Sequence, residues 1–268
     1  MRPELVDAAG TRHVPAACAP RIVSLVPSIT ELLCDLGLAG AIVGRTGFCI
    51  HPRETVRAIP KVGGTKDVDL EKLRALSPTH VILNLDENRK EDARALAEFV
   101  PTPVVTHPLA PRDNLALYRL MGGIFERDRQ AEDLCGRFEA EYRALEAAAR
   151  TFSPERVLYL IWKKPWMTVS RDTYVSRMLA LVKWETVPEK ASERYPRISL
   201  DDKVLAEART VLLSSEPYRF RDGHLAEVRA LLPGRKVVLI DGEMTAWYGS
   251  RAIKALRYLL RFRKAAAT

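Results

Sequence analysis

Short, nearly continuous apolar runs alternate with amphipathic segments along the first 110 residues. Runs rich in β-branched residues predict strands that are covered on both faces, and the amphipathic segments between them predict helices. The strands are expected over 21–26, 41–45, 80–84 and 103–106, and the helices from near residues 28, 68 and 89. This order of strands and helices is typical of a parallel sheet with right-handed crossovers.

The alternation stops between about Asn114 and Thr151, where no strand is predicted. Residues 126–150 are rich in Ala, Glu and Arg and predict one long helix. Their apolar side chains recur at helical spacing, at Leu134, Phe138, Tyr142 and Leu145. At about 1.5 Å of rise per residue, such a helix spans roughly 37 Å, which is the length of a small domain.

Strand and helix patterns return after Pro154. Strands are expected over 156–161, 210–213 and 236–240, with helices near 173–182, 200–208, 222–231 and 249–262. The predicted fold class is therefore α/β, with two Rossmann-like lobes of parallel sheet, one long backbone helix joining them and a ligand cleft between them. The expected domains are residues 1–110, 111–153 and 154–268. In open parallel sheets, ligands bind beyond the carboxyl ends of the strands.

Composition and charge narrow the possible partners. No apolar run of the 268 residues approaches the roughly 20 needed to cross a bilayer, so we expect a chain that is not embedded in a membrane. The net charge of +8 comes from 42 basic and 34 acidic residues that are spread along the chain. Scattered basic residues argue against a nucleic-acid partner and suit anionic small molecules or solubility.

The residues after the first strand allow two interpretations. Ser28 and Glu31 stand three residues apart at a predicted helix start, as in a capping box, which would be a purely structural role. Alternatively, the amide groups at this helix start hold a polar group of a ligand.

Candidate metal ligands are present in the loops but do not form a motif. His51, His107 and a carboxylate could meet, yet no two of them share a helix face or a short spacing. The four cysteines, Cys18, Cys34, Cys49 and Cys135, form no CxxC pair. No metal site is predicted, and direct coordination of a ligand's metal by Cys49, His51 or Tyr248 stays open.

Aromatic residues gather where the strands of the second half end. Trp162 and Trp166 flank Lys163, Lys164 and Pro165, which are poor core residues. The last predicted strand leads to Trp247 and Tyr248 before a helix, with Arg251 in its first turn. An arginine there opposes the helix dipole, so either it has a role or it is an ordinary surface residue.

These aromatic residues favour a binding protein over an enzyme. Together with Phe48 they suit a large, flat or partly apolar ligand. The chain contains no GxSxG, HExxH, Walker A or GxGxxG motif. An α/β enzyme that uses Asp86, Glu87 or His107 as acid or base is the alternative, and it requires a pocket carboxyl with a shifted pKa.

Several segments resemble class III periplasmic binding proteins of ABC importers. The segment DAAGTRHVPAACAPRIVSLVPSITELLCDLG is similar to the start of that family, and VGGTKDVDLEKLRALSPTHVIL to its next signature. IWKKPWMTVSRDTYVSRMLAL and AWYGSRAIKAL resemble its vitamin B12-binding branch. The resemblance implies capture of a corrinoid, haem or ferric siderophore, with no covalently bound cofactor, and delivery to an ABC permease.

The resemblance also assigns roles to single residues. It implies that Phe48, Trp162, Tyr195 and Trp247 pack on a corrin ring, with Arg251 as the nearby cation. Ser28, Lys163, Trp166 and Tyr248 complete the expected ligand site. One departure is Thr65, which stands where the branch's well-studied transporter has a tryptophan.

Permease docking is implied for one carboxylate per lobe. These are Glu71 at the start of one helix and Asp201 or Asp202 at the start of another. The structural alternative is that acidic residues at helix N-termini only stabilise the helix dipole.

The expected location is the periplasm, by family resemblance. Residues 1–20 lack the apolar core of a signal peptide, so the cytoplasm is the other possibility. The corresponding alternative function is a cytosolic corrinoid- or metal-binding protein that serves no transporter.

Overall fold

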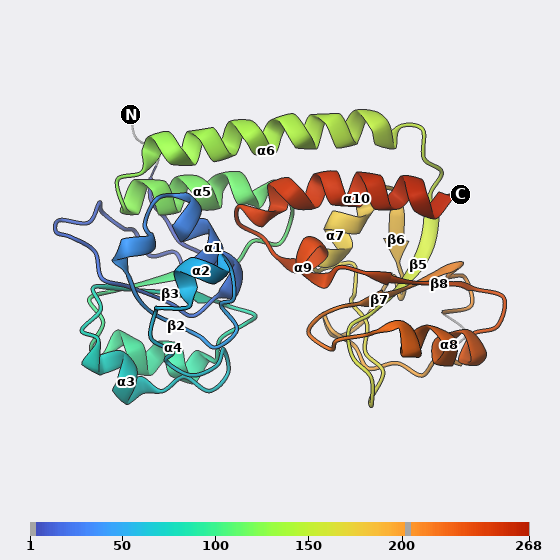
Figure 1. Cartoon of the computed structure of the whole chain (residues 1–268), viewed down its shortest axis with the longest axis horizontal. Coiled ribbons are helices and arrows are strands. Elements are labelled where there is room, and N and C mark those ends of the chain that lie inside the picture. Colours follow the sequence, from blue (N-terminus) through green and yellow to red (C-terminus); the bar gives the residue numbers. More distant parts are fainter. Residues whose placement is uncertain (1–3, 202–204, 268) are drawn as a thin grey trace. The chain divides into compact units, whose positions relative to one another are not determined.

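Two four-stranded parallel sheets form the framework of the computed structural model, which describes residues 4–201 and 205–267 (Figure 1). The strand orders are β2-β1-β3-β4 in the first sheet and β6-β5-β7-β8 in the second. Every recorded strand pair is parallel. The two halves of the chain therefore repeat one strand order, as expected for two Rossmann-like lobes, although their sequences show no obvious repeat.

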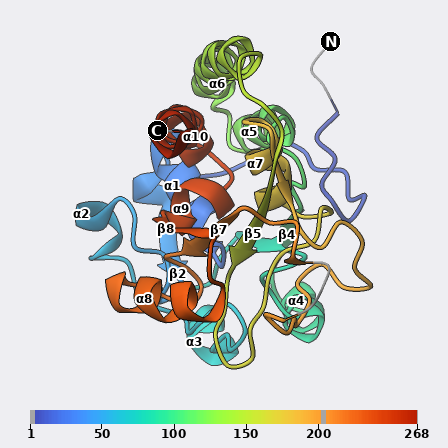
Figure 2. The ribbon, with the colours of Figure 1, turned by 90° about the vertical axis from the view of Figure 1, so that its right-hand side faces the viewer.

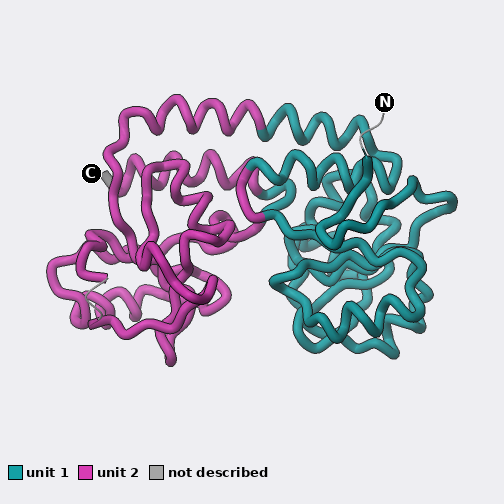
Figure 3. Tube along the Cα trace, turned by 180° about the vertical axis from the view of Figure 1, so that it is seen from behind, with its two compact units in different colours: residues 1–108, 112–138, 248–251 teal, residues 109–111, 139–247, 252–268 magenta. Residues whose placement is uncertain are grey.

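Contacts between backbone positions divide the chain into two compact units, shown in Figure 3. Unit 1 consists of residues 1–108, 112–138 and 248–251. Unit 2 consists of residues 109–111, 139–247 and 252–268. One boundary between the units falls inside the long helix that was predicted to connect the lobes.

Unit 1 contains the first sheet and the helices on its two faces. Its strands are β1 (Ile22–Ser24), β2 (Ile42–Arg45), β3 (His80–Asn84) and β4 (Thr102–Thr106). Its helices are α1 (Pro27–Asp35), η1 (Ala39–Ala41), α2 (Arg53–Val56), α3 (Leu70–Ala75), α4 (Lys90–Ala97) and α5 (Asp113–Ile124). Figure 1 shows α3 and α4 on one face of the sheet and α1 and α5 on the other. The α3–α4 face is closed by an apolar cluster that includes Val23, Val81, Leu73 and Leu96.

Unit 2 repeats this arrangement around the second sheet. Its strands are β5 (Glu155–Leu160), β6 (Trp184–Thr186), β7 (Thr210–Ser214) and β8 (Lys236–Ile240). Its helices are α7 (Tyr174–Ala180), α8 (Asp222–Leu231), α9 (Gly242–Ala246) and most of α10 (Arg251–Ala267). Figure 2 shows α8 on one side of the sheet, with α7, α9 and α10 on the other. Leu158, Leu213, Val228 and Leu232 belong to the apolar cluster beneath α8.

The predicted long helix is present as α6 (Asp128–Ala149). A separate helix, α5, precedes it, so the segment 111–153 contains two helices rather than one. The chain turns between them at Glu126, whose φ of 52° lies in the left-handed region. The seven predicted strands are all present within two or three residues of their expected ends. The short strand β6 and the helix α9 were not predicted.

Two local predictions are wrong. Ser28 does not cap α1, because the helix already begins at Pro27 and the N-cap position is Val26, which makes no side-chain cap hydrogen bond. Proline is favoured at the first helical position, since it has no amide hydrogen to leave unpaired there. The helix expected over 200–208 is not formed by the described part of that segment, where 205–207 make only a short turn.

Candidate functional site

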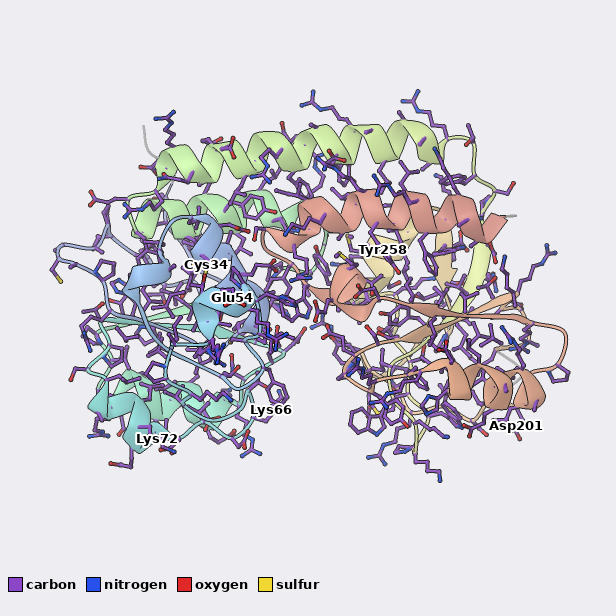
Figure 4. All side chains as sticks on the ribbon, in the orientation of Figure 1. Cys34, Glu54, Lys66, Lys72, Asp201 and Tyr258 are labelled. Atoms are coloured by element: carbon purple, nitrogen blue, oxygen red, sulfur yellow. The ribbon has the colours of Figure 1, made fainter. Side chains whose placement is uncertain are left out.

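The carboxyl edge of the first sheet presents apolar side chains to solvent. Phe48, predicted as a stacking residue, follows β2 and is 60 % exposed. Ile50 and Leu85 are also about half exposed, at 48 % and 52 %, in the loops after β2 and β3. These two residues were not predicted, although they also follow strands of the first sheet, at the edge where ligands of open parallel sheets bind. Thr65 is half-buried. It directly precedes Lys66, which is labelled in Figure 4.

The loop after β3 is fixed by its own polar side chains. Asn84 is the last residue of β3, and its Oδ1 accepts hydrogen bonds from the amides of Asp86 and Glu87 at 2.8 and 3.3 Å. Asn88 Oδ1 accepts a hydrogen bond from the Asn84 backbone amide at 2.8 Å, and Asn88 Nδ2 donates one to the Thr65 carbonyl at 3.1 Å. This network holds Glu87 at the carboxyl edge of the sheet.

Glu87 and Tyr248 form a short hydrogen bond within unit 1. The Tyr248 hydroxyl donates to Glu87 Oε1 at 2.5 Å, and Tyr248 is only 6 % exposed. Burial raises the pKa of Glu87 to about 7, against the opposing effects of the Tyr248 hydrogen bond and of Lys66. Burial and the Glu87 charge raise the pKa of Tyr248 well above its usual range, so the phenol keeps its proton.

Arg251 is buried and paired with Glu31, so it is not an ordinary surface residue. Its Nε and Nη2 donate to the two Glu31 carboxylate oxygens at 2.7 and 3.1 Å, and both side chains are less than 10 % exposed. This bidentate geometry is the favourable one for an arginine and a carboxylate. Glu31, expected to complete a capping box with Ser28, serves instead as the counterion of Arg251.

Tyr248–Arg251 is the segment that brings these partners together. The Gly249 amide donates to Asn114 Oδ1 at 2.7 Å, and the Tyr118 hydroxyl donates to the Gly249 carbonyl at 2.9 Å. Gly249 has a φ of 76°, and a Cβ there would lie 3.0 Å from the Ser28 carbonyl oxygen. Ser28 is itself buried beside this segment.

The carboxyl edge of the second sheet carries a cluster of aromatic rings. Trp162 is 39 % exposed and meets the edge of Tyr218 at 5.6 Å between ring centroids. Tyr218 packs on Phe220 at 4.7 Å, and Trp166 stacks on Phe220 at 6.3 Å with nearly parallel rings. Tyr218 and Phe220 were not predicted, although both lie in the loop after β7, as Trp162 lies after β5.

His224 orients the hydroxyl of Tyr218. The Arg221 amide donates to His224 Nδ1 at 2.9 Å, which places the ring proton on Nε2. Nε2 lies 3.2 Å from the Tyr218 hydroxyl oxygen and donates to it. The phenol proton of Tyr218 is therefore directed to another acceptor.

The other predicted residues of unit 2 lie in different environments. Lys163 is paired with Glu227 at 2.5 Å and lies 6.0 Å from the Trp166 ring centroid. Tyr195 is 36 % exposed, with the Arg194 guanidinium 5.9 Å from its ring. Trp247 is the C-cap residue of α9 and is only 8 % exposed.

The candidate metal ligands do not come together. Across residues 4–201 and 205–267, no three His, Cys, Asp or Glu side chains have the arrangement of a metal site. His107 Nε2 lies 3.4 Å from Asp86 Oδ1. Cys49 is fully buried, its sulfur receives the Thr30 hydroxyl at 3.0 Å, and burial raises the pKa of the thiol. This environment is that of an inert core cysteine.

Of the predicted docking carboxylates, two can be placed. Glu71 is exposed in the first turn of α3, next to the N-cap Asp69 that receives the Lys72 amide at 3.0 Å. Asp201, labelled in Figure 4, is exposed in unit 2, and its carboxylate accepts a hydrogen bond from the Ser199 hydroxyl. Asp202 lies outside the described residues.

A hollow of about 640 Å³ lies elsewhere in unit 1. It is lined by the N-terminal segment, including Leu5 and His13, and by α5 and α6, including Arg119 and Glu132. None of the predicted site residues lines it, so it is separate from the edge that carries Phe48 and Glu87.

Comparison with known proteins identifies the family. A model of the periplasmic binding protein family matches residues 22–229. The chain belongs to this family. The vitamin B12-binding protein of Vibrio campbellii is 24 % identical to this chain over 216 residues, which are 80 % of this chain and 78 % of that protein.

Solved structures of periplasmic binding proteins share the fold. The periplasmic vitamin B12 binding protein of Vibrio cholerae matches with a TM-score of 0.80 at 17 % identity, over 93 % of this chain and 98 % of that one. The periplasmic haem-binding protein of Roseiflexus sp. RS-1 matches with a TM-score of 0.79 at 24 % identity, over 94 % and 100 %. These matches confirm the predicted two-lobe α/β fold.

The family also bears on the enzyme alternative. The relatives are named as binding proteins, which supports a role other than catalysis. Glu87 does have the shifted pKa that an acid–base enzyme needs, but a neutral carboxyl also suits ligand recognition. Among residues 4–201 and 205–267, no helix combines the length and apolar composition that crossing a bilayer requires.

Proposed function

We propose that the chain is the solute-binding component of an ABC-type importer and captures a cobalamin-like corrinoid or another metal chelate such as haem or a ferric siderophore. The contacts proposed for the ligand are those at the carboxyl edge of each sheet. The chain acts in the periplasm, holds no covalent cofactor and delivers its ligand to a membrane permease. Vitamin B12- and haem-binding relatives support this ligand class.

One observation carries the proposal: large aromatic side chains are exposed at the carboxyl edges of both sheets. Phe48 in unit 1 and Trp162 in unit 2 are 60 % and 39 % exposed, each in the segment that follows a strand. Covering exposed rings of this size with the apolar face of a ligand is favourable, because it removes apolar surface from water. A broad, flat macrocycle offers the matching apolar faces.

The predicted residues take separate roles in this proposal. Phe48, Trp162, Trp166, Tyr195 and Trp247 contact the faces of the ring, with Tyr218 added by the structure. Ser28 and Tyr248 lie beside the α1 N-terminus and offer polar groups.

The two predicted cations are already paired. Arg251 and Lys163 reach peripheral groups of the ligand only by exchanging their partners Glu31 and Glu227. Glu71, with Asp201 or Asp202, is proposed to meet the permease.

Ligand titration tests the proposal. All four tryptophans lie in unit 2, so quenching of their fluorescence reports a ligand at that unit. We expect cyanocobalamin, haemin or a ferric siderophore to quench the wild-type protein with a saturable, micromolar or tighter affinity. Trp162→Ala is expected to weaken binding about tenfold or more, because it removes a ring that buries on the order of 100 Å² or more against the ligand.

Leu231→Ala is the matched control. Leu231 is a 51 % exposed apolar residue of the same unit, at the end of α8 that leads into the amino end of β8. The control is expected to bind as the wild type does. Absence of saturable binding by all three ligands would overturn the proposed function.

A further inference from the structure

Only one of the two carboxyl oxygens of Glu87 accepts a hydrogen bond from the described residues. Oε1 accepts the hydrogen bond from the Tyr248 hydroxyl, and within the described part of the chain Oε2 accepts none. Glu87 is half-buried, so part of the residue is accessible to solvent. The loop after β3 places Glu87 at the carboxyl edge of the sheet, the edge to which Phe48 and Leu85 also belong.

The charges around Glu87 come from three directions. Lys66, whose Nζ donates to the Asp86 carbonyl at 2.8 Å, lowers the pKa of Glu87, and the Asp86 carboxylate, 3.4 Å from His107, raises it. From residues 248–251 comes the neutral phenol of Tyr248, whose hydrogen bond also lowers the pKa of Glu87. Burial outweighs these effects and sets the pKa of Glu87 to about 7.

The hydrogen bond from Tyr248 determines which Glu87 oxygen carries the proton when the carboxyl is neutral. Its pKa is raised well above the usual range, so it stays a donor at every physiological pH and Oε1 stays an acceptor. When Glu87 takes up a proton, that proton therefore resides on Oε2. Oε2 is a charged acceptor when Glu87 is ionised and a neutral donor when it is protonated.

We propose that Glu87, oriented by Tyr248, determines specificity for the polar periphery of the ligand, accepting amide N–H groups as a carboxylate and binding carboxylate groups only after taking up a proton. This inference rests on the proposed function and names which macrocycles the site prefers. A corrinoid edged with neutral amides meets ionised Glu87 favourably. A tetrapyrrole with carboxylate side chains is repelled by it, because two like charges in a half-buried site destabilise each other.

The sign of the pH dependence follows directly. A carboxylate-bearing ligand binds the protonated form, so its affinity is full below pH 7 and falls as the pH rises through 7, by up to about tenfold per pH unit. The same ligand takes up close to half a proton per molecule bound at pH 7. An amide-bearing ligand changes little, and its affinity increases slightly as Glu87 ionises.

The experiment uses the full chain and a matched pair of ligands. Cyanocobalamin is compared with its monocarboxylic acids, in which one peripheral amide is hydrolysed, and haemin is the third probe. Dissociation constants are measured from pH 5.5 to 8.5, and calorimetry in buffers of different ionisation enthalpy counts the protons taken up. Glu87→Gln is the main variant, because it keeps the shape and removes the charge.

We expect the wild type to lose affinity for the carboxylate-bearing probes by about tenfold between pH 7 and 8.5, and Glu87→Gln to bind them with nearly constant affinity and no proton uptake. Tyr248→Phe removes a hydrogen bond that favours the ionised form, so its pH profile is expected to move to higher pH. Circular dichroism and thermal unfolding verify that both variants are folded.

Two results overturn the inference, and they are distinguishable. If the carboxylate-bearing macrocycles bind the wild type with an affinity that does not depend on pH between 7 and 8.5, or if Glu87→Gln keeps the wild-type profile for them, the inference is wrong and the proposed function stands. If no macrocycle binds the wild type at any pH, both fail together.

Discussion

Breaking the ion pair between Arg251 and Glu31 is expected to destabilise unit 1 selectively. Arg251→Met retains a long side chain of similar size but leaves the Glu31 carboxylate without its bidentate partner. Both side chains are less than 10 % exposed, so water cannot replace the lost hydrogen bonds without opening the structure. Removing one partner of a buried ion pair costs about 3–5 kcal/mol of the free energy of unfolding.

The choice of probe matters because the chain has two units and need not unfold in one step. Tryptophan fluorescence reports unit 2, which contains all four tryptophans. Hydrogen exchange of β1 and β3, measured by mass spectrometry at increasing urea concentration, reports unit 1. If the free energy of unfolding of unit 1 falls by about 2.5 kcal/mol per molar urea, the urea concentration at which unit 1 is half unfolded is expected to fall by roughly 1–2 M. The fluorescence midpoint is expected to stay closer to that of the wild type.

A control in the same unit separates burial from pairing. Arg119 forms an ion pair with Glu132 at 2.7 Å, with the two side chains 42 % and 58 % exposed. Arg119→Met is expected to cost less than about 1 kcal/mol, as for other exposed pairs. If Arg251→Met costs no more than Arg119→Met, burial of the Arg251–Glu31 pair adds nothing to the stability of unit 1.

Two further predictions concern pH and transport. Burial lowers the pKa of His80, packed edge-on against Phe125, from about 6.5 to about 4, so the unfolded state binds more protons between these values. The free energy of unfolding is therefore expected to fall by about 2–3 kcal/mol from pH 6.5 to pH 4, and urea titrations of His80→Gln should show a smaller fall. Glu71→Arg combined with Asp201→Arg is expected to abolish uptake of the ligand in a transport assay while its dissociation constant is unchanged, whereas Glu54→Arg, at an exposed position in α2, should have no effect. Normal uptake by the double variant would remove the docking assignment.

The strands were predictable because each is an apolar run that must be buried on both faces. β3 and β8 have the predicted ends, and the others differ by a few residues. β6 was missed because three residues, one of them a glutamate, are too few to show a period. α9 was missed for a similar reason, since five residues make barely more than one helical turn.

The site was predictable only in part, because its polar contacts join distant parts of the sequence. Phe48 and Trp162 were found from the rule that ligands bind at the carboxyl edges of parallel strands. Glu31 was assigned to a local capping box, but its partner Arg251 is 220 positions away. Glu87 likewise owes its short hydrogen bond to Tyr248, 161 positions away. No local pattern contains such a pairing.

The membership of residues 248–251 in unit 1 has a consequence for any attempt to produce the lobes separately. The chain enters unit 2 well before these four residues and returns to it immediately afterwards. A fragment that stops at residue 138 would lack the peptide that satisfies Glu31, Glu87, Asn114 and Tyr118. Such a fragment is expected to need a supplied peptide spanning 248–251 to fold fully, so the N-terminal lobe can be completed only after nearly the whole protein has been synthesised.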